Sequence, residues 1–388
     1  MLSSLNLHAY RAFADFSIEG LKRVSLLVGK NNVGKTSLLE AAEIVASGAT
    51  PRALFRSLFR RAERIPESEN ERGLAELDVC HLFHGHALDI GAMIKLSGLN
   101  SQPVRLDCEV VWAEAQQRLP FAEETGASAD QVIWNESALS EPLRALRVSH
   151  QETNRAVELP LTPRGGLPSN FFYRQLPVDD VSSKPVLSIP TEGLDVRSLG
   201  QLWNEIALTE AEERVIAALS IIEEGIERLT YLSSERRPNR GGSADGFFAR
   251  LKAFPNRIPF GNMGDGMKRL LALSMAVNRA AGGFLLIDEI DTGLHYSTLP
   301  DMWRLVVRTA QQLDVQVIAT THSGDCVRAL AWLHQNAPDL ASDVALHRIE
   351  RGLKQSIPFD SRNSQWLPSG TLKCVKRAIY GAERMPTR

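Results

Sequence analysis

The stretch from Val24 to Ser37, VSLLVGKNNVGKTS, decides the fold class of this 388-residue chain. It begins with Val24–Val28, a short apolar run typical of a buried strand. Residues 29–36, GKNNVGKT, match the GxxxxGK(S/T) pattern without a gap, and the LLEAAEIVA that follows has helical spacing. A strand, a glycine-rich loop and a helix in this order predict a P-loop, a phosphate-binding turn.

The residues of this loop have the properties that phosphate binding requires. Glycines let the backbone wrap closely around a phosphate, and the N-terminus of the helix presents its positive end. We expect Lys35 to bridge the β- and γ-phosphates and Thr36 to bind Mg²⁺ through its hydroxyl, whereas Lys30 is expected to be solvated. The other predicted nucleotide-binding residues of the loop are Gly29, Asn31, Asn32, Val33, Gly34 and Ser37.

Acidic residues follow a second apolar run. Phe284–Ile287, FLLI, predicts a buried strand, and Asp288 and Glu289 come directly after it. A P-loop needs a carboxylate at the end of a neighbouring strand to hold Mg²⁺. We therefore expect Asp288 to bind the metal and Glu289 to polarise the attacking water. Adjacent acidic residues are often an ordinary solvated pair, but their place at the end of a buried strand favours the functional interpretation.

A histidine follows a third apolar run. Residues 316–320 predict another buried strand, and His322 lies between this strand and a predicted helix at 324–335. A single histidine is usually structural, but this one comes at the rim where the other two motifs are expected to meet. We therefore expect His322 to contact the γ-phosphate, so that Lys35, Glu289 and His322 form the predicted catalytic group.

Strands and helices alternate in the last third of the chain. Further helices are expected at 266–281 and 298–313, and an edge strand at 344–350. This rhythm predicts an α/β fold with a mostly parallel sheet covered by helices on both faces. An antiparallel hairpin is expected at 87–115.

The predicted domains are nested rather than consecutive, because the P-loop and its carboxylates lie far apart in the sequence. Residues 1–115, with the P-loop, and residues 228–388 are expected to form the two parts of one nucleotide-binding head. Residues 116–227 are expected to form an inserted mixed α/β subdomain, which ends in a long helix over 198–227.

The composition excludes several classes of protein. Lys and Arg total 44 and Asp and Glu total 46, so the net charge of −2 excludes a generally basic coat for nucleic acid but not a local basic groove. No apolar run is long enough to span a bilayer, and the N-terminus lacks the pattern of a secretory signal. The cysteines form no CxxC pair, which disfavours a disulfide scaffold or a zinc ribbon. We therefore expect a cytoplasmic protein with no membrane partner.

Four stretches together resemble the ABC-type ATPases of the RecF/SMC branch, and are closest to the OLD type, which is often grouped with the AAA family. The resemblance covers about residues 1–48 and 228–350. Its motifs are GKNNVGKT (29–36), GNMGDGMKR (261–269), FLLIDEIDTGLH (284–295) and ATTHS (319–323).

The resemblance implies a homodimer in which two ATPase heads pair face to face with ATP and Mg²⁺ between them. A signature loop of one subunit then touches the γ-phosphate held by the other. The signature residues here are Gly264, Asp265 and Gly266, and Arg11 resembles a family position near the nucleotide. By the same resemblance, Glu289 is the catalytic base and His322 the switch histidine.

The resemblance also implies an ATP-driven switch that acts in bacterial DNA maintenance or anti-phage defence, through DNA or an effector protein. Proteins of the OLD type typically continue into a Toprim nuclease module. The residues after Glu350 are too few for such a module and contain no acidic cluster. A nuclease or toxin effector is therefore expected to be a separate polypeptide.

The sequence leaves two other functions open. One is a nucleotide-gated scaffold that hydrolyses ATP negligibly and holds an effector protein. Gly264, where the family usually has Ser, and His295, where many members have Asp, motivate this alternative. No clear Q-loop glutamine is visible either. A P-loop GTPase or small-molecule kinase is disfavoured, because no NKxD motif for guanine occurs.

Two weaker signals have ordinary interpretations. Residues 80–86, CHLFHGH, contain the ligand types that suit zinc, but this one segment would have to supply every ligand. We therefore favour a strand-end role near the nucleotide for it. An amphipathic helix in 50–72 carries arginines that either bind a phosphodiester backbone or form a solvated face. The same alternatives hold for the basic C-terminal residues Lys373, Lys376, Arg377, Arg384 and Arg388.

Overall fold

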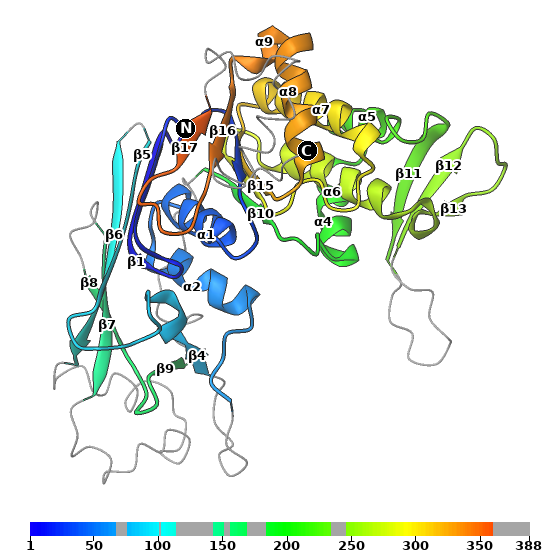
Figure 1. The fold of residues 1–388 in the computed structure, drawn as a ribbon. Coiled ribbons are helices and arrows are strands. Elements are labelled where there is room, and N and C mark those ends of the chain that lie inside the picture. Colours follow the sequence, from blue (N-terminus) through cyan, green and yellow to red (C-terminus); the bar gives the residue numbers. More distant parts are fainter. Residues whose placement is uncertain are drawn as a thin grey trace, which may run out of the picture. The chain divides into compact units, whose positions relative to one another are not determined.

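The chain folds into two compact units (Figure 1). The first unit comprises Met1–Ser3, Glu19–Leu39 and Lys184–Arg388, and the second comprises Ser4–Ile18 and Glu40–Ser183. Segments from both ends of the sequence therefore combine in the first unit, although its limits differ from the boundaries expected at residues 116 and 227. The computed structural model describes residues 1–66, 76–100, 102–113, 143–150, 156–168, 184–233 and 246–359.

A six-stranded sheet with the order β10-β14-β15-β3-β16-β17 forms the centre of the first unit. The strands from β10 to β16 are parallel, and β17 pairs antiparallel with β16. The sheet predicted from the apolar runs is thus present. β3, β14, β15 and β16 are buried along their whole length, which is why their sequences show no alternation of apolar and polar residues. The strands are β3 (Val24–Val28), β10 (Val186–Ile189), β14 (Phe284–Ile287), β15 (Gln316–Thr321), β16 (Val344–Arg348) and β17 (Ile357–Phe359).

The strand at residues 344–350 was expected at the edge of this sheet, and that expectation is wrong. β16 lies inside the sheet, between β3 and β17. The edge position belongs to β17, a three-residue strand whose Phe359 pairs with Leu346. β16 is buried along its whole length accordingly, including its polar residues His347 and Arg348.

The helices of the first unit follow its strands as predicted. Residues of α6, α7 and α8 pack with alternate residues of β3, β14 and β15 in one large hydrophobic core. Among the described residues, no helix is long and apolar enough to cross a bilayer. The helices of this group are α1 (Lys35–Ala46), α6 (Asp265–Arg279), α7 (Leu299–Gln312), α8 (Gly324–Asn336) and α9 (Pro338–Ala341).

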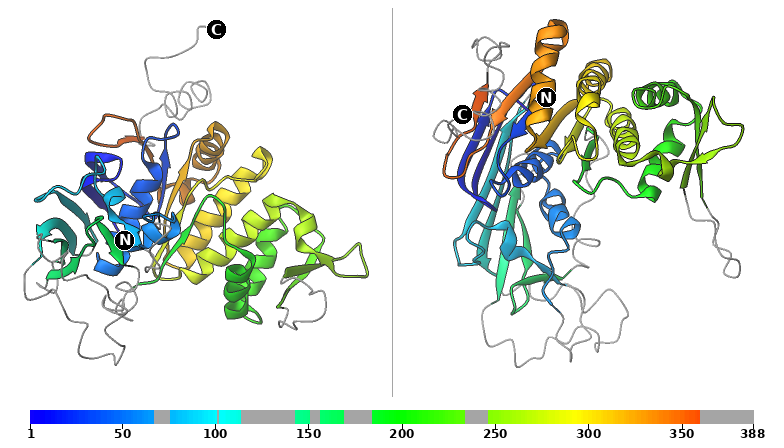
Figure 2. Two further views of the ribbon diagram at one scale, coloured as in Figure 1. Left: turned by 90° about the horizontal axis from the view of Figure 1, so that it is seen from below. Right: turned by 45° about the vertical axis from the view of Figure 1, so that its right-hand side comes forward.

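The long helix expected over 198–227 is instead two shorter helices, α4 (Val196–Ile206) and α5 (Glu210–Leu219). Leu208, between them, has a φ of 63°, which a continuing helix cannot contain. Thr209 caps α5 by accepting a hydrogen bond from the backbone N–H of Ala211. Both helices contact α6 and so belong to the first unit (Figure 2).

A small antiparallel sheet, β11-β12-β13, packs with these two helices. Its core is aromatic: Phe247 contacts the rings of Trp203 in α4 and Tyr231 in β11. The strands are β11 (Ile226–Leu232), β12 (Gly246–Leu251) and β13 (Ile258–Pro259), followed by the 3₁₀ helix η5 (Phe260–Met263).

The second unit contains a six-stranded sheet with the order β2-β1-β5-β6-β7-β8, in which every pair from β1 to β8 is antiparallel. The hairpin expected at 87–115 is confirmed as β5 and β6. The strands are β1 (Ser4–Tyr10), β2 (Phe13–Glu19), β5 (Met93–Leu99), β6 (Pro103–Trp112), β7 (Arg144–His150) and β8 (Ala156–Pro160).

The second unit also contains helix α2, the short strands β4 and β9 and the 3₁₀ helix η1. Helix α2 (Pro51–Arg60) accounts for the first part of the amphipathic segment, and residues 67–72 lie outside the described residues. A short pair of strands, β4 (Glu76–Asp78) and β9 (Gly166–Pro168), leads into the 3₁₀ helix η1 (Val79–Leu82).

Candidate nucleotide-binding site

The P-loop joins β3 to α1 in the first unit. Gly34 and Asn32 adopt left-handed backbone conformations, with φ of 95° and 61°, and Leu38 N donates to Gly34 O at 3.0 Å as the loop passes into the helix. A Cβ at Gly29 would lie 2.5 Å from the carbonyl oxygen of Ile349, so only glycine fits there. Ser37 is buried, and Asn31, Asn32 and Thr36 are exposed. This turn at a helix N-terminus has the form of an anion site.

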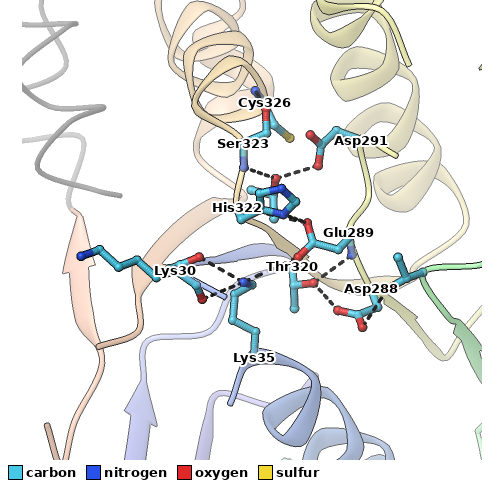
Figure 3. Close-up of polar contacts among 12 residues, drawn as sticks. Lys30, Lys35, Asp288, Glu289, Asp291, Thr320, His322, Ser323 and Cys326 are labelled. Carbon is cyan, nitrogen blue, oxygen red and sulfur yellow. Dashed lines mark hydrogen bonds and ion pairs between the residues drawn. The ribbon is translucent and has the colours of Figure 1, made fainter. Parts of the chain in front are cut away.

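The side chain of Lys35 is buried within the loop, with 6% of its surface exposed. Its Nζ donates to Gly29 O at 3.0 Å and to Lys30 O at 3.1 Å. The same ammonium lies 3.6 Å from Glu289 Oε1 (Figure 3). The structure therefore brings the predicted phosphate-binding lysine and the predicted base into one ion pair.

Asp288 lies directly after β14 and contacts Thr36 of the P-loop. Its Oδ2 accepts hydrogen bonds from Thr36 Oγ1 at 2.9 Å and from Thr191 Oγ1 at 3.1 Å, and its Oδ1 accepts one from Thr320 Oγ1 at 2.5 Å. Neighbouring oxygen ligands of an octahedral Mg²⁺ are about 2.9 Å apart at the usual bond length. The Thr36 and Asp288 oxygens thus fit Mg²⁺ both in chemical type and in spacing.

Glu289 has a strained backbone and a side chain with two partners. Its φ of 48° is left-handed, a region that non-glycine residues enter at a cost and that is frequent at functional sites. Its Oε2 accepts hydrogen bonds from His322 N at 3.2 Å and lies 2.7 Å from His322 Nδ1, while Oε1 faces Lys35. Glu289 is 14% exposed and His322 is 55% exposed, so the histidine lies at the open side of the group.

A buried arginine supports the backbone of both acidic residues. The guanidinium of Arg269, on α6, donates from Nη2 to Asp288 O at 2.8 Å and to Glu289 O at 2.7 Å, with longer contacts from Nε to Ile290 O and from Nη1 to Pro190 O. Burial lowers the pKa of Arg269, and the nearby acidic residues oppose that shift. Arg269 is missing from the predicted site. The sequence does contain a signal for it, because a charged residue on the apolar face of a helix is rarely buried without a specific partner.

The signature residues lie at the start of α6. Gly264 has a φ of 88°, and Asp265 is exposed and pairs with Lys268 at 3.0 Å. A Cβ at Gly266 would lie 3.1 Å from Gly293 O, so the helix approaches the loop after β14 closely. In the part of the chain that is described, no hydrogen bond or ion pair joins these residues to the P-loop.

Arg11 resembles a family position near the nucleotide, and that role stays a prediction. It belongs to the second unit, where its buried guanidinium pairs with Glu40 at 2.8 Å and Glu63 at 3.0 Å and donates to Ser57 Oγ at 2.9 Å. All of its described side-chain partners therefore belong to the second unit.

Comparisons with known proteins agree with an ATPase. Residues 1–141 match a family described as "AAA ATPase domain", and residues 169–325 match one described as "AAA domain, putative AbiEii toxin, Type IV TA system". An "ATP/GTP phosphatase" of Helicobacter pylori is 20% identical over 343 residues, which cover 85% of this chain and 87% of that protein. Each family match covers less than half of the chain, and both indicate a likeness to AAA-type ATPase domains.

Two solved structures are also similar. The SMC head domain of Thermotoga maritima aligns with 92% of this chain and 99% of its own, at 15% identity and a TM-score of 0.41. An Smc head domain from Pyrococcus furiosus, described as bound to the C-terminal domain of ScpA, aligns with 94% of this chain and 97% of its own, at 10% identity and a TM-score of 0.45.

Proposed function

We propose that this protein binds ATP together with Mg²⁺ and hydrolyses it. The observation that carries the proposal is the contact of Glu289 with both Lys35 and His322, at the place where the P-loop and the ends of two neighbouring strands meet. A base, a phosphate-binding lysine and a histidine at the rim are the groups that this chemistry needs. The AAA-type domain matches support the same reaction.

The contacts of Glu289 assign a role to each of its oxygens. Oε2 is occupied by the backbone N–H and the ring of His322, so the imidazole orients the carboxylate. Oε1 remains to accept the proton of the attacking water. Lys35 then turns from Glu289 to the phosphates. Thr36 and Asp288 would hold Mg²⁺, which would supply neutralisation of the phosphate charge.

The protein acts, in this proposal, as a homodimeric switch in the cytoplasm. The support is the arrangement of the signature. Among the described residues, no hydrogen bond or ion pair joins Gly264, Asp265 and Gly266 to the P-loop of their own chain, which fits a loop that contacts the partner's nucleotide instead. ATP closes the two heads and hydrolysis opens them. The closure controls DNA or a separate nuclease or toxin subunit in DNA repair or antiviral defence. The toxin–antitoxin description of the family that matches residues 169–325 favours an effector of that kind.

The alternative is a nucleotide-gated scaffold with negligible hydrolysis. It is favoured by Gly264, which leaves the signature without a side-chain hydroxyl, and by His295, whose Nδ1 lies 2.8 Å from Ser297 Oγ in its own loop. Both alternatives require ATP binding, so only turnover separates them.

Two variants test the proposal. Lys35→Ala should abolish binding of a fluorescent ATP analogue. Glu289→Gln should keep binding but lower kcat by about 100-fold or more, because it removes the proton acceptor and leaves the shape unchanged. The second variant should also accumulate as an ATP-bound dimer in size-exclusion chromatography with light scattering.

Glu213→Gln, an exposed change on α5, is the matched control and should retain full turnover. A wild-type chain that binds ATP without measurable phosphate release would contradict hydrolysis and favour the scaffold. Unchanged binding in Lys35→Ala would contradict the site itself.

A further inference from the structure

A second group of ligand-type side chains lies in the second unit, around η1. Asp78 ends β4 and caps η1, where its Oδ1 accepts a hydrogen bond from Cys80 N at 3.2 Å. Side chains three residues apart point in the same direction from a 3₁₀ turn, so the side chains of His81 and Asp78 lie next to each other. The ring Nε2 of His81 is accordingly 3.4 Å from Asp78 Oδ2. Ligand atoms of Asp78, Cys80 and His81 all lie within 4.8 Å of one another.

A fourth residue holds the His81 ring from the other side. His86 follows Gly85, and both have left-handed backbones, with φ of 57° and 86°. This turn reverses the chain and brings His86 Nδ1 to 3.2 Å from His81 Nδ1. In the tautomer in which His81 Nδ1–H donates a hydrogen bond to His86 Nδ1, Nε2 carries a lone pair that faces Asp78. Histidines that bind metals are usually oriented through the second ring nitrogen in this way.

We propose that Asp78, Cys80 and His81 bind one zinc-like divalent cation, with His86 as the residue that positions His81. Thiolate, imidazole and carboxylate together are the ligand set of Zn²⁺, and ligands of a tetrahedral zinc lie about 3.3–3.8 Å apart. The measured spacing of Asp78 Oδ2 and His81 Nε2 falls in that range. Three protein ligands leave a fourth position for water, and side-chain exposures of 24% for Asp78 and 40% for His81 give the ion access.

One short segment, residues 78–81, supplies all three proposed ligands. Asp78 adds a carboxylate that the CHLFHGH motif does not contain, and the 3₁₀ turn brings the three ligand atoms together. His84, which belongs to the motif, is not among the side chains whose ligand atoms cluster here, and its Nδ1 contacts Arg11 O at 2.9 Å. The site lies wholly in the second unit and is independent of the proposed ATPase activity.

The test is titration of the purified full-length chain with Co²⁺ alone and then Zn²⁺ alone, in a Cys374→Ser background that removes a competing thiol. Co²⁺ should give a thiolate-to-metal charge-transfer absorption that saturates at one ion per chain and disappears when Zn²⁺ is added. Co²⁺ at the P-loop has no thiolate ligand and is silent in this absorption.

Cys80→Ser should abolish the absorption, and His81→Ala should abolish saturable binding. His86→Ala should weaken Zn²⁺ binding by about 10–100-fold, as expected for a residue that orients a ligand. His84→Ala is the matched control and should bind as the parent does. All of these variants change side chains with partial exposure, and circular dichroism without metal checks their folding.

Three results would overturn the proposal. They are no charge-transfer absorption in the parent chain, an absorption that survives Cys80→Ser, or an equal loss in His84→Ala and His81→Ala. Zn²⁺ should also raise the melting temperature of the parent but not of Cys80→Ser, because an ion that binds the folded chain stabilises it. An equal rise in both would count against the site.

Discussion

The conformation of Glu289 depends on groups that are not themselves predicted catalytic residues. Its left-handed φ of 48° carries a cost of about 1–2 kcal/mol. Arg269 holds the Glu289 carbonyl at 2.7 Å, and Thr320 Oγ1 accepts a hydrogen bond from Glu289 N at 2.9 Å. Both backbone ends of the residue are therefore held in place, and the carboxylate that this backbone carries contacts Lys35 and His322.

Arg269→Met should lower kcat at least about tenfold while the Kd for ATP changes by less than about threefold. The reason is that Arg269 touches backbone carbonyls at the Asp288–Glu289 step and no predicted phosphate-binding residue, so its loss moves the base rather than the phosphates. Arg269→Lys should retain intermediate activity, because one ammonium reaches fewer of the carbonyls. Single-turnover hydrolysis and equilibrium binding separate the two effects.

Arg279→Met is the control on the same helix, since Arg279 forms an exposed ion pair with Glu205 and is expected to be neutral. An equal fall in kcat for the two methionine variants would refute a positioning role for Arg269. Parallel loss of binding and hydrolysis in Arg269→Met would instead indicate general damage to the fold.

The sequence indicated those site residues that belong to continuous motifs. Lys35, Asp288, Glu289 and His322 each follow a recognisable apolar run, and parallel strands bring such positions to one edge of a sheet. Thr191 escaped prediction because only the pairing of β10 with β14 brings it to Asp288, and single-residue hydroxyls carry no sequence pattern.

At the scale of elements, long buried strands were predictable and short or interrupted elements were not. β17 has three residues, one of them proline, and its role depends on pairing with β16 rather than on local pattern. The break between α4 and α5 did have a local signal. Thr209 and Glu212 form a capping pattern, in which Glu212 Oε2 accepts from Leu208 N at 2.6 Å, and Leu208 is 97% exposed.

β16 contains a titratable group that should make the first unit sensitive to acid. His347 is 1% exposed, and burial lowers its pKa from 6.5 to about 4, against a smaller opposing effect of a backbone contact with Gly20. Above pH 6.5 the histidine is neutral in both folded and unfolded chains, so it has no effect. As the pH falls from 6.5 towards 4, only the unfolded chain takes up the proton, and stability is lost.

We expect this group to cost about 2 kcal/mol of unfolding free energy between pH 7 and pH 5. His347→Gln should therefore lose less stability than the wild type over that interval, whatever its stability at pH 7. Urea unfolding at the two pH values measures the difference. Gln201→Asn, an exposed change on α4 that alters no titratable group, is the control and should keep the wild-type pH dependence. Identical slopes for wild type and His347→Gln would contradict the assignment.

At the scale of the whole molecule, two separate regions of the first unit have complementary roles in the proposed dimer. The P-loop group would bind the nucleotide, and the start of α6 would present Gly264 to the partner's phosphates. Arg269 connects the two regions within one chain, because it lies on α6 and holds the backbone at Asp288. A net charge of −2 also fits subunits that meet through one local surface rather than through a broad charged face.

The dimer proposal predicts complementation between two inactive variants. Lys35→Ala disables the P-loop, and Gly264→Ala disables the signature, because a Cβ there enters space that is open within the chain but is needed for close approach by the partner. If each nucleotide is shared between subunits, a mixed dimer contains one site in which both halves are intact. Equal mixing makes about half of the dimers mixed, so turnover should recover to about a quarter of the wild-type value.

The measurement is phosphate release from each variant alone and from the two after mixing. Gly264 has a left-handed φ of 88°, so Gly264→Ala is strained, and Asp265→Asn serves as a second signature variant if Gly264→Ala is too unstable to assay. Lys35→Ala mixed with Glu289→Gln is the matched control, because both changes lie in the same half of the site and no mixed dimer has an intact site. Recovery in both mixtures, or in neither, would contradict a nucleotide shared between a P-loop and a partner's signature. Recovery in the first mixture alone would show that each chain completes the other's site.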